Sequence, residues 1–95
     1  MTEPVSARGE AAVPAIRRLF RLQWEEVQQK YVLLYPEGMV QLNQSAGEIL
    51  KRCDGTASVA AITQDLELAF NQSALMADVL SFLEIAHGQG WIEYR

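Results

Sequence analysis

The chain contains few of the residues that build metal centres and cross-links: one cysteine and one histidine among 95 residues. A single cysteine, Cys53, excludes an internal disulfide, a CxxC redox pair and a four-thiolate metal cluster. A single histidine, His87, leaves no second imidazole for a zinc site. We therefore expect this protein to hold no metal and no cofactor.

The sequence also lacks a long hydrophobic run. The longest apolar and aromatic stretch, residues 31–35, is far shorter than the roughly 20 residues that a transmembrane helix needs. Residues 1–4 lack the basic start and the apolar stretch of a secretory signal peptide. The composition, 49% hydrophobic and 21% charged, is typical of a soluble globular protein. We expect a cytoplasmic protein with no membrane partner.

Positive charge is almost missing from the second half of the chain. Seven of the eight lysine and arginine residues precede Cys53, and every charged residue from 54 to 94 is acidic. The net charge of the whole chain is -4. The C-terminal half should therefore repel polyanions, whatever its fold.

The first part of the chain shows the alternation of a β-sheet. Apolar and polar side chains alternate from Phe20 to Glu25, as in a half-buried strand. Residues 30–35 are nearly all apolar and should form a central strand that is covered on both faces. The turn residues 36–38 connect them to a short third strand at residues 39–42, which predicts a hairpin.

Further along, the period of the apolar residues changes from two to about 3.6, which indicates three helices. The first begins at Asn43 or Ser45, either of which can cap it. The second is capped by Ser58, and the third begins at Ser73 and ends near His87. The third helix has an unusually broad apolar face, which is either buried completely or partly turned to a partner.

These elements predict an α+β fold: a small winged helix-turn-helix-like domain in which a three-stranded antiparallel sheet is followed by three helices. A chain of 95 residues allows one domain. We place this domain at residues 16–95, with residues 91–94 extended at its end. Residues 1–15 contain proline, glycine and small side chains without an apolar period, which predicts a flexible N-terminal arm.

No group of residues resembles an enzyme active site. Cys53 lies on the apolar face of a predicted helix near its C-terminal end, where the helix dipole disfavours a thiolate. We interpret it as a small buried hydrophobe. The glycines are isolated or lie in turns and caps, so they form no phosphate-binding loop. The sequence therefore predicts a protein that is not an enzyme.

A winged helix often binds DNA, but the predicted third helix argues against that function. A recognition helix should present lysine or arginine to phosphates and base edges. The third helix has neither, and it carries Asp78 and Glu84. We therefore expect no nucleic-acid partner, and a DNA-binding winged helix is the weakest alternative.

The remaining interpretation is that the domain binds an extended and largely apolar ligand. The edges of an open three-stranded sheet can accept another strand. The predicted third strand, residues 39–42, would form one wall of a groove, with the third helix as the other. Alternatively, the N-terminal arm or a second copy covers this edge, and a homodimer formed by strand or arm exchange is permitted.

Four segments resemble the PqqD family, which serves pyrroloquinoline quinone (PQQ) biosynthesis. They are Tyr31-Val32-Leu33-Leu34-Tyr35-Pro36-Glu37-Gly38, Leu42-Asn43-Gln44-Ser45-Ala46-Gly47-Glu48-Ile49-Leu50, Cys53-Asp54-Gly55 and Gly90-Trp91-Ile92. The resemblance covers the chain from about Leu19 to Tyr94. The segment from Leu42 to Gly55 is shared with other peptide-recognition domains, whereas the Pro36-Glu37-Gly38 turn favours PqqD itself.

The resemblance implies a non-catalytic peptide chaperone with the fold predicted above. Members of this family bind the ribosomal precursor peptide PqqA and present it to PqqE, a radical S-adenosylmethionine enzyme. The peptide adds as a strand beside the third strand and lies against the third helix. By position, the peptide-binding residues are Met39, Val40, Gln41, Leu42, Leu75, Val79, Phe82, Leu83 and Ala86.

An alternative function is that of a small carrier for the quinone product or an intermediate, since Trp24, Trp91 and Tyr94 offer rings for stacking. A thin core leaves such a carrier little enclosed volume.

Overall fold

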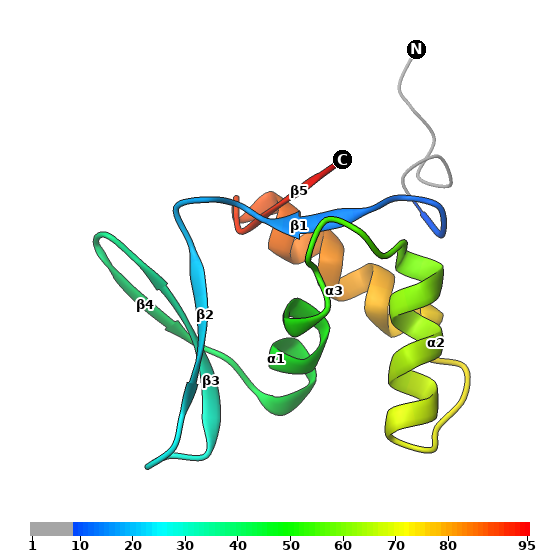
Figure 1. Cartoon of the computed structure of the whole chain (residues 1–95), viewed down its shortest axis with the longest axis horizontal. Coiled ribbons are helices and arrows are strands. Elements are labelled where there is room, and N and C mark those ends of the chain that lie inside the picture. Colours follow the sequence, from blue (N-terminus) through cyan, green and yellow to red (C-terminus); the bar gives the residue numbers. More distant parts are fainter. Residues whose placement is uncertain (1–8) are drawn as a thin grey trace.

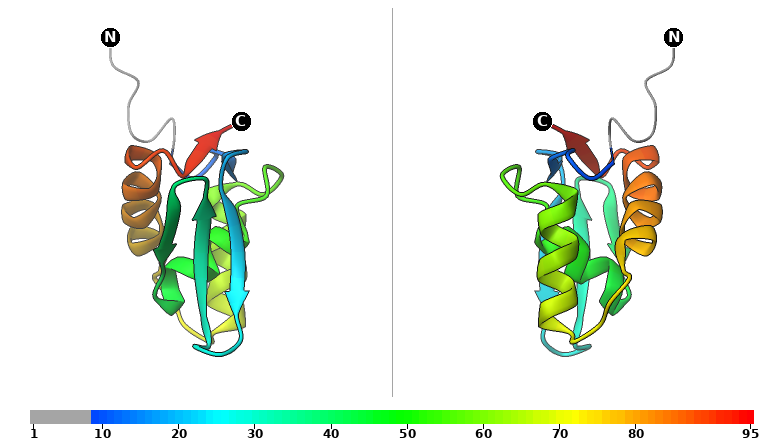
Figure 2. Two further views of the ribbon diagram at one scale, coloured as in Figure 1. Left: turned by 90° about the vertical axis from the view of Figure 1, so that its left-hand side faces the viewer. Right: turned by 90° about the vertical axis from the view of Figure 1, so that its right-hand side faces the viewer.

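The computed structural model describes residues 9–95, which form five strands and three helices (Figure 1). The elements are β1 (Pro14–Ile16), β2 (Arg21–Glu25), β3 (Lys30–Tyr35), β4 (Gly38–Gln41), α1 (Gln44–Lys51), α2 (Val59–Ala69), α3 (Met76–Gly88) and β5 (Ile92–Tyr94). The three helices lie on one side of the sheet formed by β2, β3 and β4 (Figure 2). The predicted α+β fold, with a three-stranded antiparallel sheet followed by three helices, is confirmed.

The three-stranded sheet is an antiparallel meander with β3 at its centre. The neighbouring residues Val32 and Leu33 point to opposite faces, and both are buried, as expected for a central strand. The hairpin turn is tighter than predicted. Gly38 pairs with Tyr35, so that only residues 36 and 37 form the turn. The third strand is therefore Gly38–Gln41 and begins one residue earlier than predicted.

A second, two-stranded sheet joins the two ends of the described chain. Strand β1 pairs antiparallel with β5, and Pro14 lies opposite Tyr94. The N–H of Arg95 donates to the C=O of Val13 at 2.8 Å. The N–H of Val59 donates to the C=O of Ala12, also at 2.8 Å. The C=O of Glu10 also accepts a hydrogen bond, from the N–H of Ala60 at 2.9 Å. Residues 10–15 are thus part of the packed domain, although we predicted them within the N-terminal arm. Residues 1–8 of that arm lie outside the described residues.

Two of the three predicted helix caps are confirmed. The Oδ1 atom of Asn43 accepts a hydrogen bond from the N–H of Ala46 at 2.8 Å, so Asn43 rather than Ser45 caps α1. The Oγ atom of Ser58 accepts from the N–H of Ala61 at 3.1 Å and caps α2. Both caps satisfy N–H groups that the first turn of a helix leaves unpaired.

The predicted start of the third helix at Ser73 is wrong, because α3 begins at Met76. Ala74 has a φ angle of 60°, a left-handed conformation that interrupts the chain just before the helix. The N–H of Leu75 is satisfied by the carboxylate of Glu67 on α2, at 3.0 Å. A tertiary contact therefore takes the place of the local serine cap.

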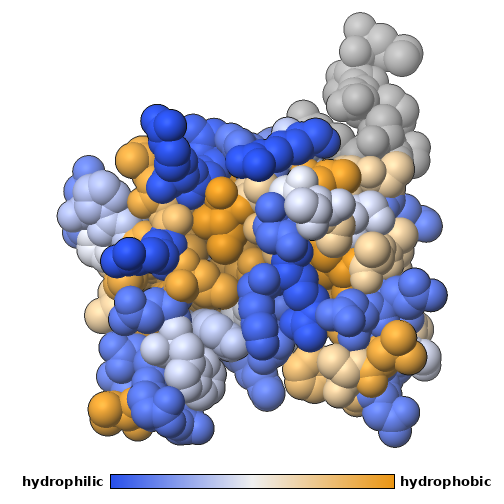
Figure 3. Space-filling view, viewed as in Figure 1, coloured by the Kyte–Doolittle hydropathy of each residue, from blue (hydrophilic) through white to orange (hydrophobic). Residues whose placement is uncertain are grey.

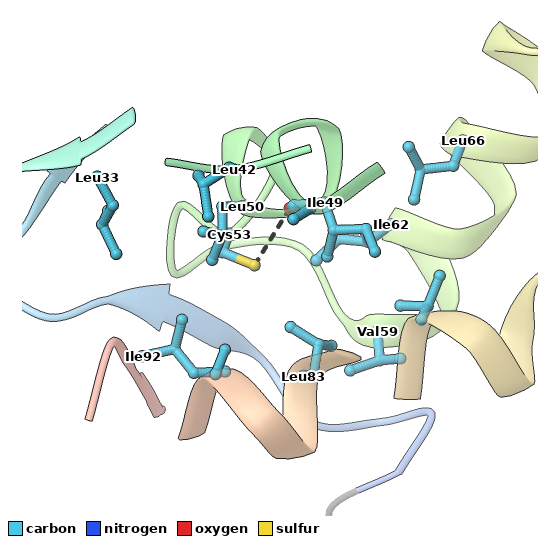
Figure 4. Packing of buried hydrophobic residues seen from close by; sticks show 13 residues of the cluster. Leu33, Leu42, Ile49, Leu50, Cys53, Val59, Ile62, Leu66, Leu83 and Ile92 are labelled. Atoms are coloured by element: carbon cyan, nitrogen blue, oxygen red, sulfur yellow. Dashed lines mark hydrogen bonds between the residues drawn. The ribbon is translucent and has the colours of Figure 1, made fainter. Parts of the chain in front are cut away.

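The core forms where the sheet, the three helices and β5 meet. Each of these elements contributes a side chain that is almost completely buried, and these side chains point toward one another in Figure 4: Leu33, Leu50, Val59, Leu83 and Ile92. None of the helices α1 to α3 is long and apolar enough to cross a membrane. The face shown in Figure 3 has apolar surface between β2 and α1, framed by hydrophilic residues.

Cys53 is part of this core, as predicted. It is buried, and its Sγ atom lies 3.3 Å from the C=O of Ile49, to which it donates a hydrogen bond (Figure 4). Burial, together with the neighbouring charge of Asp54, raises the pKa of Cys53 to about 12. The thiol therefore stays protonated at neutral pH and is a poor nucleophile.

Candidate peptide-binding groove

The free edge of β4 is the first component of the candidate site. Within residues 9–95, this strand pairs only with β3. The N–H of Leu42 donates to the C=O of Tyr31, its partner in the register, at 3.1 Å. Because bonded pairs alternate along an antiparallel ladder, the backbone of Val40 also points toward β3. The N–H and C=O groups of Met39 and Gln41 therefore point outward, where an added strand would need them.

Helix α3 lies beside this edge and encloses a groove with it. The left view of Figure 2 shows α3 next to β4, at the edge of the sheet that lies farthest from β2. The groove has a volume of about 410 Å³. One wall is the end of β4 with the start of α1, and the other is α3 with the residue before β5. The lining residues are Val40, Gln41, Leu42, Asn43, Ser45, Ala46, Ile49, Asp78, Phe82, Ile85 and Trp91.

The helical wall is a stripe of three residues on α3: Asp78, Phe82 and Ile85. Their spacing of four and three residues places the side chains on one face of the helix. Phe82 is half-buried, whereas Ile85 keeps 57% of its surface exposed. Within residues 9–95, this apolar surface faces an unpaired strand edge with nothing packed between them.

Three of the four predicted edge residues line the groove. Val40, Gln41 and Leu42 line it directly. Met39 contributes its outward-pointing backbone, while its side chain is exposed. The position of the edge was thus predicted correctly from the sequence, but its role in peptide binding stays a prediction.

The five predicted residues of the helical wall are divided between solvent-accessible surface and core. Phe82 lines the groove, and Leu75 and Val79 line the adjoining pocket described below. Val79, Leu83 and Ala86 are 2%, 0% and 0% exposed and pack in the core. These three side chains have almost no surface to offer to a ligand.

Three residues of the second wall were not predicted as peptide contacts: Asp78, Ile85 and Trp91. The broad apolar face of the third helix left two possibilities open: complete burial, or a part turned to a partner. However, the helical period alone does not show which stripe turns inward. Ile85 follows Phe82 by one turn, and this spacing was the signal that could have identified it.

A second pocket adjoins the groove near the N-termini of α1 and α3. It has a volume of about 310 Å³ and lies between α1, the end of α2 and the start of α3. It shares Ser45, Ile49 and Asp78 with the groove. Its other lining residues are Gln44, Glu48, Leu66, Phe70, Gln72, Leu75 and Val79.

The groove and the second pocket contain negative charge and no positive charge. Neither lining includes a lysine or an arginine. Glu48 is paired with Arg52, whose Nη1 atom lies 2.9 Å from its carboxylate and whose Nε atom pairs with Asp65. Asp78 has no hydrogen-bond or ion-pair partner within residues 9–95. The site thus suits an apolar ligand that also carries a cation.

The aromatic rings considered for a quinone carrier have different neighbours. Trp24 packs edge-on against Tyr31, with 4.9 Å between the ring centroids. Tyr94 lies beside His87 at a centroid distance of 5.2 Å. Of the three rings named for that function, only Trp91 lines the groove. Within residues 9–95, we therefore find no common stacking site for Trp24, Trp91 and Tyr94.

Comparison with known proteins places this geometry in a family. Residues 30–92 match the family described as Coenzyme PQQ synthesis protein D (PqqD). A protein of Pseudomonas paraeruginosa described as "PqqA binding protein" is 55% identical over 85 residues, covering 88% of this chain and 92% of the relative. A protein of Methylococcus capsulatus with the same description is 49% identical over 74 residues, 78% of this chain and 80% of the relative.

Two solved structures share the fold. The solution structure of the PqqD part of Methylobacterium extorquens PqqCD, described as a stand-alone recognition element for ribosomally synthesized and post-translationally modified peptides, has a TM-score of 0.73 and 34% identity. The match covers 85% of this chain and 88% of the chain in that structure. The crystal structure of PqqD from Xanthomonas campestris has a TM-score of 0.52 and 35% identity, covering 79% of this chain and 86% of its own. The chain therefore belongs to the PqqD family of PQQ synthesis proteins.

Proposed function

We propose that this protein is a non-catalytic chaperone that binds the precursor peptide PqqA as an added strand on β4. The observation that carries the proposal is the free edge formed by Met39 and Gln41, opposite the apolar stripe with Phe82 and Ile85. The names of the relatives as PqqA binding proteins support the identity of the ligand.

The edge also favours a particular pattern of ligand side chains. Side chains alternate between the two faces of a sheet, and those directly opposite each other share a face. Peptide residues opposite Val40 and Leu42 would therefore point toward the α1 and α3 side of the sheet, into the groove. We expect apolar residues at these two peptide positions, which are separated by one residue.

The expected affinity follows from the size of the contributions. Each backbone hydrogen bond contributes only about 0.5–1.5 kcal/mol net. Apolar contacts with the groove must supply much of the rest, at about 25 cal/mol per Å² of buried apolar surface. Ordering a flexible peptide opposes binding by about 2–5 kcal/mol. A dissociation constant in the micromolar to sub-micromolar range is therefore expected.

The protein would act by presentation and not by chemistry. The groove has no activated nucleophile, since the thiol of Cys53 is in the core with a raised pKa. A peptide in an open groove keeps its outer face accessible to a second protein. We propose that this second protein is the radical S-adenosylmethionine enzyme PqqE and that the transfer takes place in the cytoplasm.

The same edge also suits a second copy of the chain, because an unpaired strand accepts any complementary strand. Self-association through β4 would then compete with peptide binding. We expect the apparent dissociation constant of the peptide to rise with protein concentration if such a homodimer forms, and light scattering would detect the dimer directly.

The test is calorimetric titration of full-length PqqA into the wild-type protein and into Ile85→Asp. Ile85 is mostly exposed, so the variant should fold, and the new carboxylate should oppose an apolar ligand. We expect at least a tenfold loss of affinity, which corresponds to about 1.4 kcal/mol. The matched control is Leu68→Asp, an exposed leucine on α2 outside both linings. Equal affinity in the wild type and Ile85→Asp would overturn the proposed groove.

A further inference from the structure

The groove does not end where β4 ends. Past Gln41 the chain turns inward: Leu42 is buried, and Asn43 caps α1. A peptide strand that follows β4 in this direction loses its pairing partner at this point. It arrives above the start of α1, where the second pocket begins with the shared residues Ser45 and Ile49.

The second pocket has the character of a side-chain site. Leu66 is almost fully buried and forms its floor. The half-buried Leu75 and the 39% exposed Phe70 form its walls. An apolar side chain that entered this pocket would cover apolar surface that the domain leaves open.

Charge makes the expected ligand more specific. Asp78 lies where the groove and the pocket meet, and it has no partner within residues 9–95. The other carboxylate of the pocket, Glu48, is already paired with Arg52. Within residues 9–95, neither lining contains a lysine or an arginine, so the Asp78 carboxylate is open to a cation that the ligand brings.

We propose that the bound peptide continues beyond β4, across the start of α1, and places an apolar side chain between Leu66, Phe70 and Leu75 and a basic side chain beside Asp78. This inference rests on the proposed function, because it names a second set of contacts for the same peptide. The recognised ligand is therefore longer than the strand-paired segment and contains an apolar and a basic residue next to that segment.

Two pairs of variants test these contacts by calorimetry with full-length PqqA. Phe70→Ala is compared with Leu68→Ala, which removes a more exposed apolar side chain from the same helix outside the pocket. Asp78→Asn is compared with Glu84→Gln, an exposed acid on the same helix outside both linings. We expect Phe70→Ala to weaken binding about tenfold. Asp78→Asn should weaken it about threefold at low salt, and the difference should vanish in high salt. The two controls should bind like the wild type.

Nested truncations of PqqA from each end locate the contacting segment. Removing the end that occupies the pocket should weaken binding to the wild type but not to Phe70→Ala, since the variant has already lost that contact. Amide NMR of the wild type provides a readout that needs no variant. Full-length PqqA should shift the signals of Leu66, Phe70 and Leu75, and the truncated peptide should not.

The outcomes separate this inference from the proposed function. If Ile85→Asp abolishes binding while Phe70→Ala and Asp78→Asn bind like the wild type, the groove is correct and its extension is wrong. If Ile85→Asp and the wild type bind equally, the proposed groove fails, and the extension fails with it. Losses in both regions, together with pocket shifts that depend on one end of the peptide, would support both proposals.

Discussion

The sheet has two free edges, and they differ in ways that matter for binding. In the part of the chain that the structure describes, strands β2 and β4 each pair only with β3. The outer face of β2 carries Arg21 and Glu25, whereas β4, Gly38–Gln41, contains no charged residue. Charged side chains on an edge strand hinder the addition of another strand. By this criterion β4 is the more receptive edge.

Apolar surface alone does not distinguish the two edges. Leu19, Trp24 and Val27, in β2 or next to it, are all exposed, and Figure 3 shows apolar surface between β2 and α1. What β4 has in addition is a second wall, because α3 lies beside it and closes a groove. A strand on β4 would thus gain backbone hydrogen bonds and side-chain burial together, which is the combination used in strand-addition complexes.

The largest expected effect is on stability, and it concerns the buried face of α3, the helix that only the β4 edge has beside it. Val79 is 2% exposed, so Val79→Asp would bury an unpaired carboxylate in the core. We expect a loss of more than about 4 kcal/mol in the free energy of unfolding, which would unfold a domain of this size. Circular dichroism of the purified variant would show it.

Ile85→Asp is the matched comparison, because it also introduces an aspartate on α3, but on the exposed face of the helix. It should change the free energy of unfolding by less than about 0.5 kcal/mol, as at other surface sites. A folded and stable Val79→Asp variant would mean that Val79 does not face the core, and the assignment of the two helix faces would be wrong.

The next effect concerns the outward backbone of β4. Gln41→Pro removes an N–H that points away from β3, so the hairpin keeps its internal hydrogen bonds. The proline ring and the missing donor should nevertheless block an added strand. We expect affinity for PqqA to fall at least thirtyfold, or about 2 kcal/mol, while the free energy of unfolding falls by less than about 1 kcal/mol.

Gln41→Thr is the control for this variant, since it changes the side chain but keeps the N–H group. It should bind the peptide like the wild type in the same titration. If Gln41→Pro binds as well as Gln41→Thr, then the peptide does not pair with β4, and β2 becomes the edge to test.

Features that depend on neighbouring residues could be predicted from the sequence. The hairpin follows from an apolar run and a short second strand that are separated by Pro36 and Glu37. The caps Asn43 and Ser58 act on N–H groups only three residues away. The burial of Cys53 could be predicted from its place in the apolar pattern, although α1 ends at Lys51, two residues before it. The location of the β4 edge belongs to this group, because it requires only the hairpin and its order in the chain.

Features that depend on distant residues could not be predicted. Strand β1 exists because β5, at the other end of the chain, pairs with it. The start of α3 depends on Glu67 from the preceding helix, which replaces the expected cap at Ser73. The same limit applies to the helical wall: whether Val79 or Ile85 is exposed depends on how α3 rotates against the sheet.

The smallest expected effect concerns the charges on β2. In the double variant Arg21→Gln/Glu25→Gln, the outer face of β2 loses both of its charges, as on β4. These are surface side chains, so the free energy of unfolding should change by less than about 0.5 kcal/mol. Binding of PqqA should be unchanged, because β2 still lacks the second wall that α3 provides to β4.

Self-association should nevertheless rise slightly in this double variant, because neutral edge strands pair more readily. Sedimentation of the wild type and the variant over a range of concentrations would measure the difference. Stronger peptide binding by the variant, with amide shifts on β2, would show that edge charge and not the groove decides where the strand adds. An unchanged affinity with a small increase in self-association would mean that the second wall is what makes one edge of this sheet a binding site.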